Sequence, residues 1–222
     1  MLIGIKAQLK KEILLEWRQR YALNGMLLFA GSTVFISYLS LGVRSGDLSV
    51  FTWNALFWII ILFTAVNAIT KSFMQEKQTR NLYYYNLTSP QVLILSKIIY
   101  NFLLMIVLTY TAYIFYSMVM GNPVEDFLLF AIVLLLGSLS FAGTLTLVSG
   151  IASKAGTGGG MLMAILSFPI IIPVLMLLIK CSKHAIDGLD RSLIWGDVFV
   201  LLAINAMVIA ISYLLFPFIW KS

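Results

Sequence analysis

The longest polar stretch of the chain, residues 71–97, lies between two apolar segments. It holds four lysine or arginine residues, Glu76, the run Tyr83–Tyr85 and the break Ser89-Pro90. These side chains can form ion pairs and aromatic contacts with another protein. They lack the spacing of a nucleophile with its base or of paired catalytic carboxylates. The stretch therefore predicts a docking segment that projects into water.

A glycine-rich sequence at residues 153–160, SKAGTGGG, has the composition of a phosphate-binding loop. A P-loop requires GxxxxGK[ST] after a β-strand, so that the lysine follows the glycines. Here Lys154 precedes the glycines, and an apolar segment precedes the loop. We interpret it as a short connection, and we expect a chain that is not itself catalytic and does not hydrolyse ATP through this loop.

Two residues near the end of the chain, His184 and Trp195, could take part in haem handling, and the single cysteine allows no internal disulfide. His184 is the only histidine, Cys181 is the only cysteine, and Trp195 lies in the sequence Ile-Trp-Gly-Asp. A single histidine can ligate haem iron, but it is more simply a solvated loop residue, and a tryptophan at the start of a span is ordinary. We expect no metal site and no directly bound cofactor.

The composition is that of a membrane protein. Hydrophobic residues make up 61% of the chain, charged residues 11%, and the mean hydropathy is +0.98. Soluble domains carry about 25% charged residues. The net charge of +6 comes mostly from basic residues beside apolar segments, which favours lipid headgroups over nucleic acid as the partner.

The apolar segments predict an all-α, polytopic fold with six transmembrane helices in one membrane domain, residues 1–222. The length of each segment fits the roughly 20 residues that cross a bilayer. The expected spans are residues 22–43, 50–70, 95–120, 127–151, 161–179 and 198–220. Residues 71–94 form the large connecting loop.

Residues 1–20 predict an amphipathic helix on the membrane surface. Leu2, Ile5, Leu9, Ile13 and Trp17 recur at spacings of three and four and form one apolar stripe. The basic residues on the remaining surface include Lys10, Lys11 and Arg18. A basic helix with tryptophan on its apolar face suits the interface. It is either a generic anchor or an elbow helix that leads into the first span.

Most of the 15 lysine and arginine residues lie on one side of the expected spans. The positive-inside rule places that side, with both termini and residues 71–94, in the cytoplasm. No Asp, Glu, Lys, Arg or His lies in the middle of an expected span, which argues against an ion-coupled transporter and an intramembrane enzyme. Small residues in the fourth span instead predict close helix packing.

The order of a basic surface helix, two spans, a large loop and four more spans resembles the membrane subunit of an export-type ABC transporter. Over essentially the whole chain it resembles the haem exporter protein B family (CcmB) of cytochrome c maturation. The local match consists of Phe73, Glu76, Lys77, Leu82, Pro90 and Lys97. The chain differs from the family at Asn81-Leu82-Tyr83, where members often carry Gly-Ser/Thr-Leu-Glu.

The resemblance implies an export-type ABC permease fold whose coupling loop docks on an ATPase subunit that binds ATP-Mg. Its docking positions would be Phe73, Glu76, Lys77, Arg80, Leu82 and Pro90. The implied partners are an ATPase resembling CcmA, membrane proteins resembling CcmC and CcmD, and a haem chaperone resembling CcmE, with two permease copies per ATPase dimer. Haem would be the cargo, or ATP would release the haem-loaded chaperone.

Two alternatives keep this architecture. The chain could serve as an export-type permease for a drug, a lipid or a polysaccharide. It could also be a non-transporting scaffold that relays ATPase motion to neighbouring proteins. Adjacent genes for haem handling, or haem movement into vesicles that contain only this chain and its ATPase, would separate these functions.

Overall fold

The computed structural model describes residues 2–18, 21–41, 48–69, 89–153 and 159–221. The chain is all-helical over this part. Its helices are α1 (Leu2–Arg18), α2 (Tyr21–Leu41), α3 (Val50–Ile69), α6 (Pro90–Met120), α7 (Phe127–Ala152), α8 (Gly159–Ile186) and α9 (Trp195–Lys221), with a short 3-10 turn, η2, at Arg191–Leu193.

Five of these helices, α3 and α6 to α9, are long and apolar enough to cross a membrane. A sixth, α2, has a shorter apolar part at Asn24–Ser40. The predicted polytopic all-α fold is therefore confirmed. The largest extensions beyond the expected spans are at the start of α6, which begins at Pro90, and at the end of α8, which continues to Ile186.

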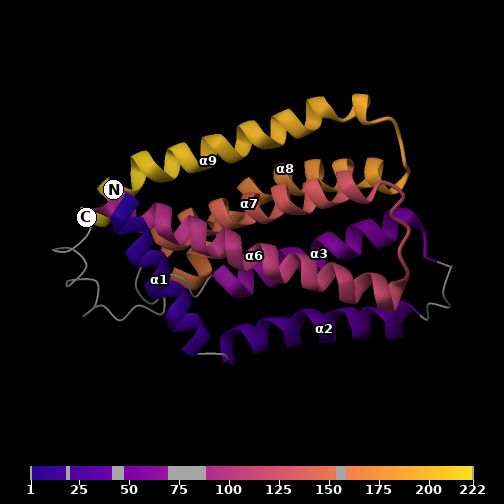
Figure 1. Ribbon diagram of the computed structural model, residues 1–222, viewed down its shortest axis with the longest axis horizontal. Helices are drawn as coiled ribbons and strands as arrows, with labels where there is room; N and C mark the ends of the chain where they lie inside the picture. The colour runs from indigo at the N-terminus through magenta and orange to yellow at the C-terminus, as the bar shows by residue number, and fades with distance from the viewer. Residues whose placement is uncertain (1, 19–20, 42–47, 70–88, 154–158, 222) are drawn as a thin grey trace.

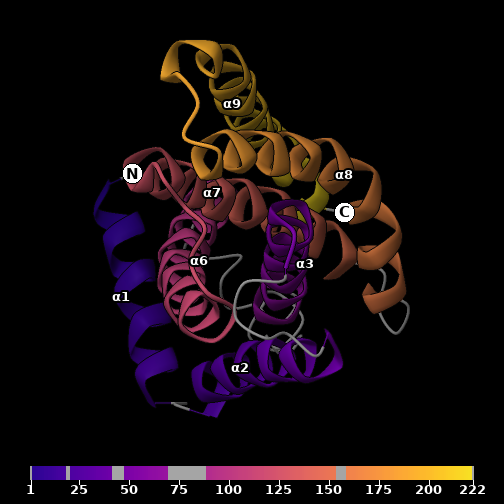
Figure 2. The same cartoon turned by 90° about the vertical axis from the view of Figure 1, so that its right-hand side faces the viewer.

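Helix α7 lies inside the bundle, in contact with α3, α6, α8 and α9, and Figure 2 shows it between α8 and α9 on one side and α3 and α6 on the other. Every residue from Ser140 to Gly150 is buried. A helix that is enclosed on all sides needs small side chains so that its neighbours can approach. The small residues that the sequence singled out for this reason are all buried in α7: Gly137, Ser138, Ser140, Ala142, Gly143 and Thr144.

A buried polar network joins α3 to α8. Trp58 Nε1 donates to Ser182 Oγ at 2.8 Å, and Ser182 Oγ donates to Asn54 Oδ1 at 2.7 Å. Asn54 Nδ2 donates in turn to the carbonyl of Ile179 at 2.9 Å. The indole of Trp58 lies against α7, where a Cβ on Gly137 would meet its ring at 2.7 Å. Hydrogen bonds and close packing thus fix the relative positions of α3, α7 and α8.

An aromatic cluster joins α3, α6 and α7. Trp53 contacts the ring of Tyr116 edge to face, with centroids 4.9 Å apart, and Phe130 lies 5.0 Å from Tyr113. Phe57 contacts the rings of both tyrosines. The polar ends are also paired, since the Tyr116 hydroxyl donates to the carbonyl of Trp53 at 2.9 Å. Such a cluster provides both apolar contact and specific geometry.

Candidate functional site at the termini end of the bundle

The start of α1 and the end of α9 lie at the same end of the bundle, which we call the termini end (Figure 1). Helix α3 ends there at Ile69 and α6 begins there at Pro90. The chain between them, residues 70–88, carries the predicted docking segment. Helix α1 crosses this end obliquely and packs beside α6 (Figure 2). The termini end therefore gathers the amphipathic helix and both attachment points of the docking segment.

Five of the six predicted docking residues, namely Phe73, Glu76, Lys77, Arg80 and Leu82, lie outside the described residues. The sixth, Pro90, is the first residue of α6 and is half-buried. Ser89 before it is extended, with φ −66° and ψ 143°. Proline fits the first position of a helix because it has no N–H to leave unpaired. Pro90 thus marks the point where the connection becomes helix.

The prediction that residues 71–97 project into water is wrong for the end of that stretch. Residues from Pro90 onward are helical, and Val92, Leu93, Ile94 and Lys97 are buried. Leu93, Ile94 and Ile98 form a small core cluster with Phe216 of α9. The physical reason is that the apolar residues after Pro90 continue the period of α6, and α1 and α9 cover them.

Helix α1 presents a partly polar side to α6. Gly4 lies close enough for a Cβ to meet Val92 Cγ1 at 3.2 Å. Lys11 and Glu12 are half-buried, whereas Lys10 is exposed and Ile13 is 48% exposed. The residues of the predicted apolar stripe therefore do not all pack against the rest of the protein. Of the other two predicted interfacial residues, Trp17 and Arg18, the structure gives only the helix and not the side chains.

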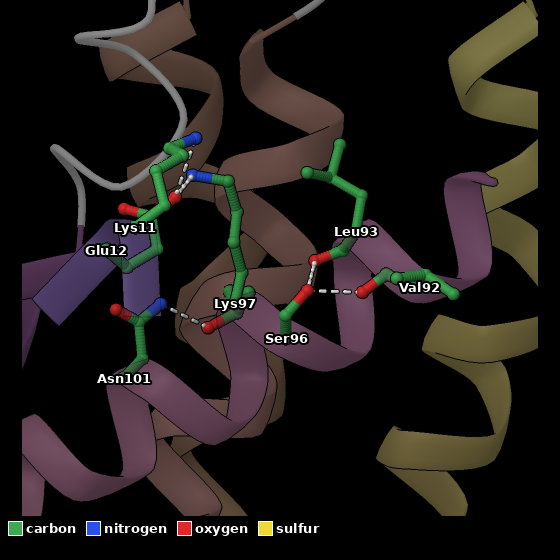
Figure 3. Close-up of polar contacts among 8 residues, drawn as sticks. Lys11, Glu12, Val92, Leu93, Ser96, Lys97 and Asn101 are labelled. Carbon is green, nitrogen blue, oxygen red and sulfur yellow. Dashed lines mark hydrogen bonds and ion pairs between the residues drawn. The ribbon is translucent and has the colours of Figure 1, made fainter. Parts of the chain in front are cut away.

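A buried ion pair connects α1 to α6, as Figure 3 shows. Lys97 Nζ lies 3.6 Å from Glu12 Oε1, and Lys11 Nζ lies 3.3 Å from the same oxygen. The side chain of Lys97 is 2% exposed and that of Glu12 is 15% exposed. Sequence reasoning assigned Lys97 to the start of the third span but overlooked Glu12. The available signal was an acidic residue within a strongly basic helix.

The opposite end of the bundle is held by ion pairs between its connections. Arg191 donates to Asp126 through Nε at 2.6 Å and through Nη2 at 2.9 Å. Asp126 also caps α7 by accepting from the backbone N–H of Leu129 at 3.0 Å. Lys180 pairs with Asp197 at 2.8 Å. These contacts connect the turn before α7 to η2, and the last turns of α8 to the first turn of α9.

Two residues that the sequence placed in the loop after the fifth span lie in α8 instead. His184 was interpreted as a solvated loop residue, but it belongs to the last turn of the extended helix and is half-buried. Cys181 is buried in the core. Among the described residues, no three His, Cys, Asp or Glu side chains form a group that could hold a metal ion.

The Asp126–Arg191 pair should make stability depend on pH. The hydrogen bond from Arg191, then that from the Leu129 N–H, lowers the pKa of Asp126 below its ordinary value of 3.8. The carboxylate therefore stabilises the fold above that value, and the contribution is lost as pH falls through the lowered pKa. We expect Asp126→Asn, which keeps a capping oxygen, to lower the thermal unfolding temperature near neutral pH. The deficit should disappear in acid, and a deficit that is independent of pH would contradict this role.

A comparison with protein families matches the chain to CcmB protein over residues 4–219. This chain belongs to the CcmB family. Membership of this family supports the role of a membrane permease subunit of an ABC transporter for haem export in cytochrome c maturation. A comparison with curated proteins found no match. The resemblance inferred from residues 71–97 and the order of the spans is confirmed.

Proposed function

We propose that this CcmB-family chain couples ATP hydrolysis by a partner ATPase subunit to haem export, or to release of a haem-loaded chaperone. In this proposal the part of residues 71–94 that precedes Pro90 lies in the cytoplasm of a bacterial cell and docks on the ATPase. Closure of the ATPase around ATP-Mg displaces the docking segment. The displacement passes directly into α6, which begins where the segment ends.

The observation that carries the proposal is the length and continuity of α6. It runs without interruption for 31 residues, from Pro90 to Met120. At 1.5 Å per residue it spans ~46 Å, compared with a hydrocarbon core of about 30 Å. The helix is therefore long enough to project beyond the hydrocarbon. Because it packs along α7, a force on its first turns reaches that helix inside the bundle.

The partners in this proposal are those of a cytochrome c maturation complex. They comprise an ATPase resembling CcmA, membrane proteins resembling CcmC and CcmD, and a haem chaperone resembling CcmE. Two copies of the chain would serve one ATPase dimer. Family membership supports an ATPase partner. The two outcomes of ATP hydrolysis are separable, because haem should accumulate in vesicles that contain only this chain and its ATPase if the chain itself exports haem.

Reversing the charges of the docking segment should abolish coupling. We expect Glu76→Lys combined with Lys77→Glu to remove the stimulation of ATP hydrolysis by the chain, because each charge would meet a like charge on the ATPase. The chain should still insert in the membrane, since both residues precede the start of α6. The measurement is ATPase activity and co-purification of the two subunits from membranes.

A matched control reverses two exposed charges at the opposite end of the bundle. Lys183→Glu with Asp187→Lys makes the same change in charge on exposed side chains of the described chain. We expect normal stimulation in this variant. Normal stimulation in the Glu76/Lys77 variant would refute the docking role, and equal loss in both variants would show that the effect is not specific to the docking segment.

A further inference from the structure

Helix α1 is attached to the first turns of α6 at two separate points. Gly4 contacts Val92, and Glu12 pairs with Lys97. At 1.5 Å per residue these points are about 12 Å apart along α1 and about 7.5 Å apart along α6. Two contacts that are separated along both helices fix the angle between them as well as their distance. A movement of the first turns of α6 must therefore move α1 or break one of the contacts.

The two attachment points differ in their chemistry. The Gly4–Val92 contact is a close steric approach that any helix of this shape could make. The Glu12–Lys97 contact joins a half-buried carboxylate to the ammonium group of Lys97, which is among the most deeply buried large side chains of the described chain. Burying charges is costly, and the cost is offset only when both partners are present and correctly placed. The ion pair therefore specifies one register of α1 on α6.

The opposite side of the same turns of α6 is held by apolar contacts. Leu93, Ile94 and Ile98 pack against Phe216 near the end of α9. The start of α6 thus lies between α1 on one side and α9 on the other. Because residues 89 and 90 lead directly into these turns, any displacement of the docking segment reaches the Glu12–Lys97 pair within the first turns of α6.

From this geometry we propose that Glu12 and Lys97 are positioning residues that join α1 to the base of α6, so that both helices move as one unit when the docking segment is displaced. This inference rests on the proposed coupling function. Helix α1 is then a part of the coupling apparatus in addition to its place at the membrane surface. Neither residue touches the ATPase or the cargo in this proposal.

Variants in which Glu12 or Lys97 alone is replaced by an uncharged residue test this connection between α1 and α6 in cells that produce the complete complex. We expect Glu12→Gln and Lys97→Met to lower the yield of mature cytochrome c about tenfold, within the range of typical couplings between sites. The ATPase should still co-purify with the chain, because the docking segment is unchanged. The exchanged pair, Glu12→Lys with Lys97→Glu, should restore most of the yield. Lys183→Gln, which removes an exposed cation at the opposite end, should have no effect.

A distance measurement separates positioning from simple stability. Spin labels on Ala7 of α1 and Ile99 of α6, both exposed, report the distance between the helices in the purified complex. We expect one narrow distribution both without nucleotide and with ATP trapped. Glu12→Gln should broaden the distribution in both states. Since Lys97→Met could fail to accumulate in membranes, Glu12→Gln at a normal membrane level decides the outcome.

Two results would refute the proposal that Glu12 and Lys97 join α1 to α6. One is a normal yield of cytochrome c in Glu12→Gln, and the other is an exchanged pair as defective as the single variants. Failure of the docking proposal has a different signature, because the Glu76/Lys77 charge reversal would then leave ATPase stimulation intact. The reversal could also abolish stimulation while Glu12→Gln behaves as the native chain. That result would support the docking role and refute the proposed role of the Glu12–Lys97 pair.

Discussion

Replacing Gly137 by alanine should destabilise the bundle strongly for so small a change. The added Cβ would lie 2.7 Å from the ring of Trp58, and 3.2 Å from a methyl group of Leu178. Trp58 cannot move away easily, because its side chain is fully buried and its Nε1 donates to Ser182. Overpacking of a close-packed core costs about 1–3 kcal/mol. Thermal unfolding of the purified chain in detergent should show the loss.

Gly143 on the same helix provides the matched control. A Cβ at this position would meet only Val208 Cγ1, at the ordinary contact distance of 3.5 Å. Both substitutions gain the same intrinsic helix propensity, so this term cancels between them. We expect Gly143→Ala to unfold at or above the temperature of the native chain. Equal behaviour of the two variants would mean that the approach of α7 to Trp58 does not limit packing.

Ser182→Ala should produce the second large loss of stability, because one hydroxyl joins three side chains and two helices. Its removal leaves Trp58 Nε1 without the acceptor at 2.8 Å and Asn54 Oδ1 without the donor at 2.7 Å. Each buried polar group that loses its partner costs about 1–3 kcal/mol, although hydrogen bonds between membrane helices average about 0.6 kcal/mol. We therefore expect a total loss on the order of 2 kcal/mol.

A serine on α7 serves as the control, and a double-mutant cycle isolates the interaction. Ser140 is equally buried, but its hydroxyl donates to the carbonyl of Leu136 in its own helix. Ser140→Ala should therefore cost much less than Ser182→Ala. Combining Ser182→Ala with Trp58→Phe should cost less than the sum of the two single changes, since both remove the same bond. Strict additivity would show that the bond contributes nothing.

The two stability predictions concern the same junction of α3, α7 and α8, and this junction matters for the proposed coupling. Helix α6 packs on α7, which in turn is fixed against α3 and α8 by Gly137, Trp58 and Ser182. A closely packed bundle transmits a displacement from one helix to the next, whereas a loosely packed bundle absorbs it. We expect Gly137→Ala also to lower cytochrome c maturation at equal membrane levels of the chain.

The sequence by itself determined the features that depend on local composition. Long apolar segments require helices in a bilayer because backbone groups must be hydrogen-bonded internally, so the all-α polytopic fold followed from hydropathy alone. The residues Phe73, Glu76, Lys77, Leu82, Pro90 and Lys97, together with the order of the spans, indicated the family, which the match over residues 4–219 confirms. The small residues of α7 correctly predicted close helix packing.

Only the tertiary structure decided which polar residues meet. The sequence predicted that residues 71–97 project into water as one polar stretch whose end runs into the third span at about residue 95, because charge and polarity were averaged over the stretch. Whether Lys97 is solvated depends on what covers it, and Glu12 of α1, which is distant in sequence, lies against it. Glu12 and Lys97 lie on separate helices whose periodicities say nothing about their relative angle. Trp58, Ser182 and Gly137 meet for the same reason, since contacts between helices depend on packing angles that a single chain pattern does not encode.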